Sequence, residues 1–218
     1  MSHSHASHPA IPASEALARL HAGNESFRAG CFNNALQSGC AQDLLAGQHP
    51  FAAILCCSDS RVPPEILFDL SLGDLFVVRN AGHVLDDASV GSLEYAIEHL
   101  GVQLIVVLGH AKCGAVTATV AADAAAATVS GAATAAETAH NAPVKDHIPS
   151  IMNLILPALE KVRGQAGDPV ANAIDAHIVG TVNQLKAEPV MAEASSHTGL
   201  QVVGLRYNLC DGTLTPVA

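Results

Sequence analysis

The chain has few aromatic residues and no tryptophan. Five Phe and two Tyr are its only aromatic residues in a sequence of 218, although half of the residues are hydrophobic. The core must therefore be built from Ala, Val, Leu and Ile, and this length is enough for one domain with a sizeable core. The formal net charge of −10 at pH 7 argues against the basic surface that nucleic acids require. We predict a single domain without a nucleic-acid partner.

Long apolar runs and a disulfide framework are also lacking. No apolar run approaches the ~20 residues of a membrane-spanning helix. The His-containing start of the chain lacks the apolar core of a signal peptide. The six cysteines show no framework pattern for a chain of this size. We therefore expect no membrane partner and a reducing, cytoplasmic location, where thiols serve as metal ligands or core residues.

What the sequence does contain is an alternation of short apolar runs with helical patterns. Runs of this kind predict buried parallel strands at 51–57, 75–79, 104–109 and 200–207. Helical patterns are found at 15–20, 88–100, 148–162 and 170–188, the first with Ser14 as its expected N-cap. The alternation predicts an α/β fold, with a mostly parallel β-sheet and flanking helices. Asp211-Gly212 is a hairpin-type turn, so 214–217 should add an antiparallel C-terminal edge strand.

Thiols and an imidazole follow two of the predicted strands. Cys57 ends one strand, and His110 and Cys113 follow another, three positions apart. Functional groups in open α/β sheets gather beyond the carboxyl ends of the strands, so these three side chains should meet. Three ligands of this kind with one open position are typical of a catalytic zinc. Cys56 is interpreted as a buried core residue.

An acid and an arginine accompany the first of these ligands. Asp59 lies two residues after Cys57, and Arg61 two further on. A bidentate arginine can hold the carboxylate away from the metal, so that it accepts a hydrogen bond there instead of closing the site. Taken alone, the two residues would be interpreted as a surface ion pair. Because two thiolates make zinc-bound water less acidic, we predict an alkaline working range.

With these residues the chain resembles the β-class carbonic anhydrases. The stretch from Gln48 to Ala115 carries the pattern of that family in four motifs: CSDSRVP at 57–63, GDLFVVRNAG at 73–82, GSLEYA at 91–96 and GHAKCGA at 109–115. The resemblance implies zinc-dependent, reversible hydration of CO₂ to bicarbonate and a proton by attack of zinc-bound hydroxide. It also implies one Zn²⁺ per subunit on Cys57, His110 and Cys113, with Asp59 and Arg61 as the catalytic dyad.

The resemblance implies a small apolar substrate pocket as well. Gln48 matches a glutamine whose amide bonds a substrate oxygen, and Gly114 matches a backbone N–H that faces the substrate. Phe76 and Tyr95 match pocket residues that come partly from a neighbouring subunit, and Ala81 replaces a larger pocket residue of some members. Without the resemblance, Gln48 would be interpreted as a solvated loop residue, and the two aromatic residues as ordinary core.

The family also sets expectations for assembly and for the division of the chain. It implies a homodimer, or a tetramer formed from two dimers, in which an N-terminal helical arm embraces the partner. We expect a disordered His-rich tail over 1–12 and one domain over 13–218. Within the domain we expect the arm at 13–48 and an alanine-rich variable segment at 118–142.

Several alternatives stay open at the level of sequence. The same scaffold could hydrolyse CS₂ or COS, or the chain could be a non-catalytic zinc protein for storage, sensing or scaffolding. His83 is a candidate proton carrier, with a structural loop histidine as the alternative. We also hypothesise a closed state at low pH, in which Asp59 itself ligates zinc.

Overall fold

The structure, a computed structural model, describes most of the chain. The described residues are 10–31, 44–45, 47–129 and 146–218. Parts of three predicted segments lie outside them: 1–9 of the tail, 32–43 and 46 of the arm, and 130–142 of the alanine-rich segment.

A single five-stranded sheet runs through the described part of the molecule, in the order β2-β1-β3-β4-β5. The strands are β1 (Ala52–Cys57), β2 (Leu75–Asn80), β3 (Leu104–His110), β4 (Gln201–Tyr207) and β5 (Leu214–Pro216). The first four pair in parallel, and β5 pairs antiparallel with β4. Every residue of β1 and β3 is buried, as the continuous apolar runs predict for strands covered on both faces. The predicted fold class is confirmed.

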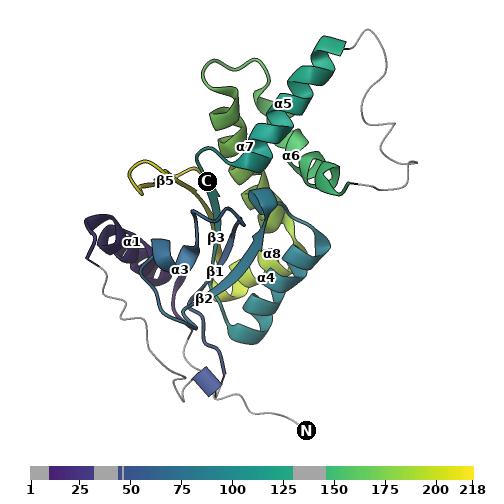
Figure 1. The fold of residues 1–218 in the computed structure, drawn as a ribbon. Helices are drawn as coiled ribbons and strands as arrows, with labels where there is room; N and C mark the ends of the chain where they lie inside the picture. The colour runs from purple at the N-terminus through teal and green to yellow at the C-terminus, as the bar shows by residue number, and fades with distance from the viewer. Residues whose placement is uncertain (1–9, 32–43, 46, 130–145) are drawn as a thin grey trace.

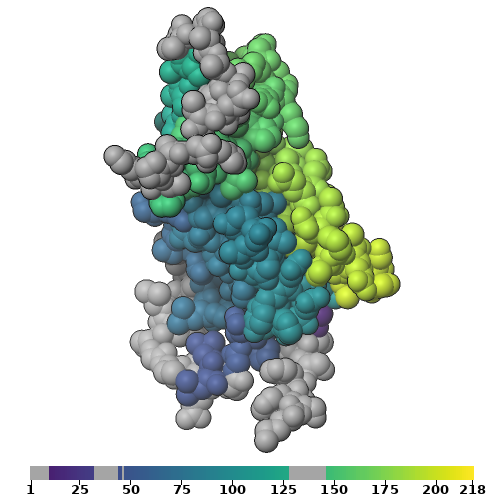
Figure 2. Space-filling view, turned by 90° about the vertical axis from the view of Figure 1, so that its right-hand side faces the viewer, coloured from purple at the N-terminus to yellow at the C-terminus, as the bar shows by residue number. Residues whose placement is uncertain are grey.

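Helices cover both faces of the sheet and extend beyond one of its edges. They are α1 (Ala13–Ala29), α3 (Pro64–Leu67), the short 3₁₀ helix η1 (Ala81–His83), α4 (Asp87–Leu100), α5 (Gly114–Val129), α6 (Ile148–Val162), α7 (Pro169–Ala187) and α8 (Pro189–Thr198). In Figure 1, α1 and α3 lie on one side of the sheet, and α4 and α8 on the other. Figure 2 shows α5 and α6 rising beyond the level of α4. Among the described residues, none of the helices has the length and apolar character needed to cross a bilayer.

The first helix begins earlier than the sequence predicts. Ser14 is not the N-cap, because α1 begins at Ala13 and Pro12 occupies the cap position without a side-chain hydrogen bond. The Pro12 carbonyl accepts from the Ala16 N–H at 2.9 Å, which places Ser14 inside the first turn. The helix then continues to Ala29 and ends at Gly30, whose left-handed conformation is typical of a C-cap.

Close backbone contact attaches α1 to the rest of the domain. Gly23 lies so near Phe68 that a Cβ at that position would stand 1.7 Å from the Phe68 carbonyl oxygen. The buried Asn24 side chain donates to the carbonyl oxygens of Leu67 and Gly212, at 3.1 Å each. The helix thereby joins the segment after β1 to the turn before β5.

The arrangement of β1 beside β3 positions the candidate site. The two strands pair in parallel with Cys56 opposite Leu108, so both end at the same edge of the sheet. Helix α7 packs against β3, and a Cβ on Gly109 would stand 2.5 Å from the Ile178 Cδ1 atom of that helix. Glycine at this position therefore permits close approach of the helix just before the predicted ligand His110.

Candidate metal centre

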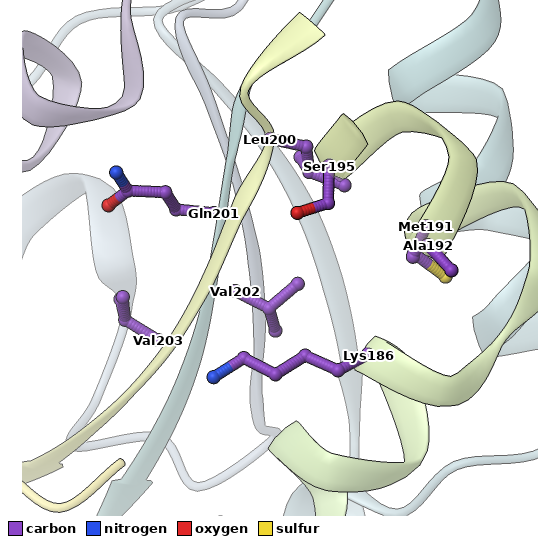
Figure 3. A pocket seen from close by; sticks show the side chains of 8 residues that line it. All are labelled: Lys186, Met191, Ala192, Ser195, Leu200, Gln201, Val202 and Val203. Carbon is purple, nitrogen blue, oxygen red and sulfur yellow. The ribbon is translucent and has the colours of Figure 1, made fainter. Parts of the chain in front are cut away.

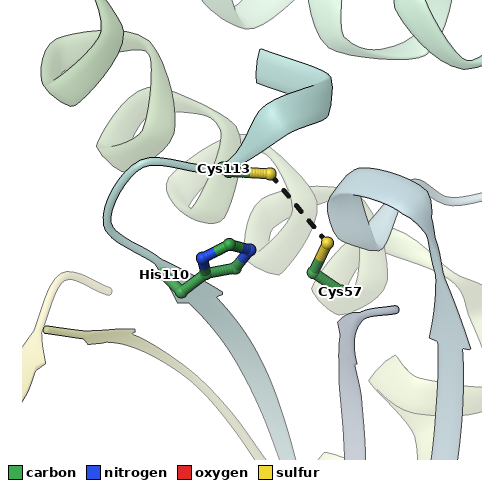
Figure 4. Close-up of side chains that lie close together, drawn as sticks. All are labelled: Cys57, His110 and Cys113. Carbon is green, nitrogen blue, oxygen red and sulfur yellow. Dashed lines mark hydrogen bonds between the residues drawn. The ribbon is translucent and has the colours of Figure 1, made fainter. Parts of the chain in front are cut away.

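Three predicted ligand side chains converge at the shared edge of β1 and β3. The Sγ atoms of Cys57 and Cys113 and a ring nitrogen of His110 all lie within 4.8 Å of one another. The two sulfur atoms are 4.0 Å apart, and all three residues are buried (Figure 4). Among the described residues, no other group of three His, Cys, Asp or Glu side chains converges in this way.

A tight turn between β3 and α5 returns Cys113 toward the end of the strand. The Ala111 N–H donates to the Tyr207 carbonyl at 2.9 Å, which extends the pairing with β4 past His110. Lys112 then adopts a φ of 55°, a left-handed conformation that is uncommon for a residue with a side chain. The sharp reversal brings Cys113 back over His110, and α5 begins at the next residue.

The orientation of His110 leaves one ring nitrogen available to a ligand. Nδ1 lies 2.9 Å from the Ala111 carbonyl oxygen, and because a carbonyl can only accept, Nδ1 carries the proton. In the neutral ring Nε2 is then a bare acceptor, and it is buried and without a hydrogen-bond partner among the described residues. Since an unpaired buried acceptor is costly, this atom fits a metal ion that requires a lone pair.

The pKa values of the two thiols move in opposite directions because one thiol donates a hydrogen bond to the other. Hydrogen bonding from Cys113 is the main cause that lowers the pKa of Cys57, and the same pairing raises the pKa of Cys113. The Cys57 sulfur also accepts the Gly82 N–H at 3.3 Å. Cys57 is therefore the thiol that loses its proton first. Two thiols with one imidazole form a donor set that suits zinc.

Asp59 and Arg61 form a bidentate pair beside the cluster of Cys57, His110 and Cys113. Arg61 donates from Nε to Oδ1 at 2.9 Å and from Nη2 to Oδ2 at 2.7 Å, and its backbone N–H reaches Oδ1 at 3.0 Å. These bonds hold the pKa of the Asp59 carboxyl well below its usual range. Oδ2 also lies 3.9 Å from Nε2 of His110, so the carboxylate faces the cluster while its oxygens are occupied by the guanidinium.

Arg79, to which the sequence interpretation gave no role, forms hydrogen bonds with the backbone of Cys57 and Asp59. Its guanidinium donates to the Cys57 carbonyl from Nε at 3.1 Å and from Nη2 at 3.0 Å. Nη2 also donates to the Asp59 carbonyl at 2.8 Å. One side chain from β2 therefore links the predicted ligand to the predicted dyad. The signals in the sequence are a charged residue near the end of an otherwise apolar strand and its place in the GDLFVVRNAG motif at 73–82.

The predicted pocket residues do not all lie together in the chain. Ala81 begins η1 and Gly114 begins α5, both exposed and one residue from Gly82 and Cys113 respectively. Phe76 and Tyr95 pack against each other, with ring centroids 6.2 Å apart. Tyr95 is 46% exposed, which contradicts its interpretation as ordinary core.

The aromatic pair and the glutamine stand apart from the cluster within one chain. Tyr95 also contacts the His99 ring, at a centroid distance of 4.8 Å. Gln48 is exposed in the segment before β1. Among the described residues, no hydrogen bond, ion pair or ring contact joins Gln48, Phe76 or Tyr95 to the three convergent side chains.

His83 does not suit the role of an exposed proton carrier. Its side chain is fully buried, and neither ring nitrogen has a hydrogen-bond partner among the described residues. Burial and the neighbouring His177 hold its pKa well below the usual range, so it is neutral. The ring packs instead on His177, at a centroid distance of 4.5 Å. The alternative interpretation, a structural histidine, agrees with this environment.

A cavity of about 540 Å³ lies elsewhere, at the junction of α7, α8 and β4 (Figure 3). Its lining is formed by Lys186, Met191, Ala192, Ser195, Leu200, Gln201, Val202 and Val203. None of these is a predicted site residue, and none is His, Cys, Asp or Glu. The cavity therefore adds nothing to the candidate metal centre.

Comparison with known proteins connects this geometry with one family. A sequence model of the carbonic anhydrase family matches residues 52–214. "Carbonic anhydrase" of Mycolicibacterium smegmatis is 40% identical over 171 residues, which cover 78% of this chain and 75% of that protein. "Carbonic anhydrase 2" of Mycobacterium tuberculosis is 57% identical over 104 residues, 47% of this chain and 50% of that protein. The matched part thus spans about half the length of that second relative.

A solved structure shares the fold over nearly the whole chain. It is the β-carbonic anhydrase CafA of Aspergillus fumigatus, with 28% sequence identity and a TM-score of 0.64. The match covers 93% of this chain and 89% of that one.

Proposed function

Because the chain belongs to the β-class carbonic anhydrase family, we propose that it catalyses the reversible hydration of CO₂ to bicarbonate and a proton. The single observation that carries the proposal is the convergence of the Cys57, His110 and Cys113 ligand atoms within 4.8 Å. The bidentate Asp59–Arg61 pair beside them adds a group that a purely structural metal site has no need of.

One Zn²⁺ per subunit is the proposed cofactor. Cys57, His110 and Cys113 would hold it through their two sulfurs and the free Nε2. When bound, zinc supplies a Lewis acid that lowers the pKa of water and so provides a nucleophile. Because two thiolates offset the charge of the ion, we keep the expectation of an alkaline working range.

Asp59 and Arg61 have complementary parts in the proposed mechanism. With its pKa held low by Arg61, Asp59 stays a carboxylate and can accept a hydrogen bond from the nucleophile. Both of its oxygens receive guanidinium N–H groups, which keeps the carboxylate from becoming a fourth metal ligand. The acceptor therefore fixes the direction of attack while the open position stays open.

The substrate is proposed to lie over the exposed start of α5. There Gly114 offers its N–H to a CO₂ oxygen, and the small Ala81 leaves room beside it. Gln48, Phe76 and Tyr95 are proposed to complete an apolar pocket when a second subunit is present. The half-exposed Tyr95 agrees with such a shared site. A homodimer, alone or paired into a tetramer, is therefore the proposed assembly, and the cytoplasmic location stays a sequence-based prediction.

Stopped-flow CO₂ hydration on protein of measured zinc content tests the proposal. We expect rapid, zinc-dependent hydration that rises toward alkaline pH. Asp59→Asn should retain zinc and lose about 10- to 100-fold in rate. The matched control is Asp123→Asn, because Asp123 forms a bidentate pair with Arg163 at 2.7 and 2.9 Å away from the cluster. This control should hydrate CO₂ at the parent rate.

Two other outcomes would redirect the assignment. Turnover of CS₂ or COS in place of CO₂, under the same zinc loading, would make the chain a hydrolase on this scaffold. A fully zinc-loaded protein that converts none of the three substrates at any pH would be a non-catalytic zinc protein. Equal rates for Asp59→Asn and the parent chain would remove Asp59 from the mechanism.

A further inference from the structure

An imidazole from α7 forms a hydrogen bond with the backbone of the short helix η1. Nε2 of His177 lies 2.9 Å from the carbonyl oxygen of Gly82, 95 positions earlier in the chain. Because a carbonyl only accepts, Nε2 must carry the hydrogen. His177 is only 5% exposed, and burial lowers its pKa, so it donates as a neutral ring.

The same glycine contacts a predicted metal ligand through its other backbone group. The Gly82 N–H donates to the Cys57 sulfur at 3.3 Å. Gly82 has a φ of 75°, and a Cβ there would stand 2.9 Å from the Ile155 Cδ1 atom and 3.0 Å from the Ala115 Cβ atom. Glycine is therefore required at a point that joins Cys57 on one side to His177 on the other.

Among the described residues, His177 is the side chain that bonds the Gly82 carbonyl. His83 follows Gly82 in sequence but donates to nothing among the described residues, and its ring lies against that of His177. His83 itself has a φ of 45°, so two consecutive residues of η1 are in left-handed conformations. Backbone of this kind needs outside support, because a residue with a side chain is strained there.

We propose that His177 is a positioning residue for the metal ligand Cys57, acting through the Gly82 peptides. The inference rests on the proposed zinc site. The hydrogen bond from His177 fixes the Gly82 carbonyl, and the fixed backbone directs the Gly82 N–H at the sulfur. Hydrogen bonds to a ligating thiolate tune both its orientation and its donor strength, so His177 affects the metal without contacting it.

The test uses His177→Leu, which removes the donor but fills most of the volume. Zinc affinity is measured by competition with a chelator, and the sulfur-to-metal charge-transfer band is recorded on Co²⁺-substituted protein. We expect zinc affinity to fall about 10-fold. The band should move to longer wavelength, because a thiolate that no longer accepts the hydrogen bond from the Gly82 N–H transfers charge to the metal more readily. His177→Gln, whose amide can donate to the same carbonyl, should restore both properties toward those of the parent chain.

A matched variant separates this effect from loss of stability. Val182 is fully buried on α7, near Gly204 and away from η1. Val182→Ala should lower thermal stability without changing zinc affinity or the charge-transfer band. If His177→Leu and Val182→Ala gave the same affinity and band, the inference would be overturned. Should His177→Leu fail to fold, His177→Met takes its place with the same expected changes.

These readouts are independent of catalysis. The expected shifts in affinity and absorption, found in a protein that does not hydrate CO₂, would support the inference and refute the proposed function. Hydration of CO₂ with the band unmoved in His177→Leu would do the opposite. Failure of the parent chain to bind either Zn²⁺ or Co²⁺ would overturn both.

Discussion

Arg61 occupies both carboxylate oxygens of Asp59 while one of these oxygens stands 3.9 Å from Nε2 of His110. The carboxylate is thus within a short movement of the predicted ligand set, and the guanidinium opposes that movement. The contact also explains why two residues that resemble a surface ion pair in sequence lie next to buried thiols. The side chain of Asp59 is only 16% exposed.

Removing the guanidinium should let Asp59 close the site. In Arg61→Met the carboxylate loses both side-chain bonds, so we expect it to ligate zinc and hydration to fall by about 10- to 100-fold. X-ray absorption should then show one additional protein oxygen in the zinc coordination shell. Arg163→Met breaks the comparable pair with Asp123 and should leave both measurements unchanged. An unaltered shell in an inactive Arg61→Met would count against the restraining role of Arg61.

The low pKa of Asp59 predicts how the pair responds to acid. Because the folded pKa lies below the unfolded value, the stabilisation is complete above the unfolded pKa, near 3.9 for an aspartate, and is lost as the pH falls through the folded pKa. The difference in unfolding free energy between the parent chain and Arg61→Met should therefore be constant from pH 8 to about 5 and shrink below about 4. Urea unfolding across this range measures it.

The lowered pKa of Asp59 also limits the possible causes of a loss of activity in mild acid. Protonation of Asp59 cannot explain a fall in hydration between about pH 8 and 6, because its pKa is lower still. A fall in that range with unchanged zinc coordination would refute the predicted closed state at low pH. In the urea experiment, a difference in unfolding free energy between the parent chain and Arg61→Met that shrinks already near neutral pH would contradict the lowered pKa of Asp59.

Adjacent cysteines provide a matched pair for testing the metal site. Cys57 points into the cluster, whereas Cys56 is fully buried, and burial raises its pKa to about 12. Cys57→Ser should weaken zinc binding severely, because a hydroxyl is a poor substitute for a thiolate. Cys56→Ser should cost about 1–3 kcal/mol of stability from a buried hydroxyl, and keep full zinc content. The zinc content of each variant is measured after dialysis. Loss of zinc from both variants would mean that the stability of the protein, and not ligation by Cys57, sets the metal content.

The sequence predicted the parts of the site that depend on position along strands. Alternation of apolar runs with helices placed Cys57 and His110 at the ends of parallel strands, and β1 and β3 are indeed neighbours. The spacing of three residues between His110 and Cys113 predicted that Cys113 lies close to the same strand end. These predictions succeeded because strand ends and short turns are set by nearby residues.

Contacts made across the fold were not predicted. Arg79 reaches the Cys57 carbonyl from another strand, and His177 reaches Gly82 from a helix 95 positions later. Neither has a signature in local spacing, because the partner in each case is a backbone carbonyl, which every residue carries. The exposure of Tyr95 and the burial of His83 likewise depend on which helices cover which strands.

The attachment of α1 to the domain depends on glycine at position 23. In Gly23→Ala the new Cβ would overlap the Phe68 carbonyl oxygen, which is backbone and cannot rotate away. The helix must therefore shift, and Asn24 then loses its bonds to Leu67 and Gly212. We expect a loss of about 1–3 kcal/mol in unfolding free energy, toward the upper end because the contact is with backbone.

Gly180 in α7 is the matched control, because a Cβ there meets nothing within 4 Å. Gly180→Ala should stabilise the protein by about 0.5–1 kcal/mol, since alanine has the higher helix propensity. Urea unfolding of the two variants beside the parent chain measures both changes. A stable Gly23→Ala would mean that α1 is not tightly docked at Phe68, whereas opposite signs for the two glycines would show that close packing, and not helix propensity, selects glycine at position 23.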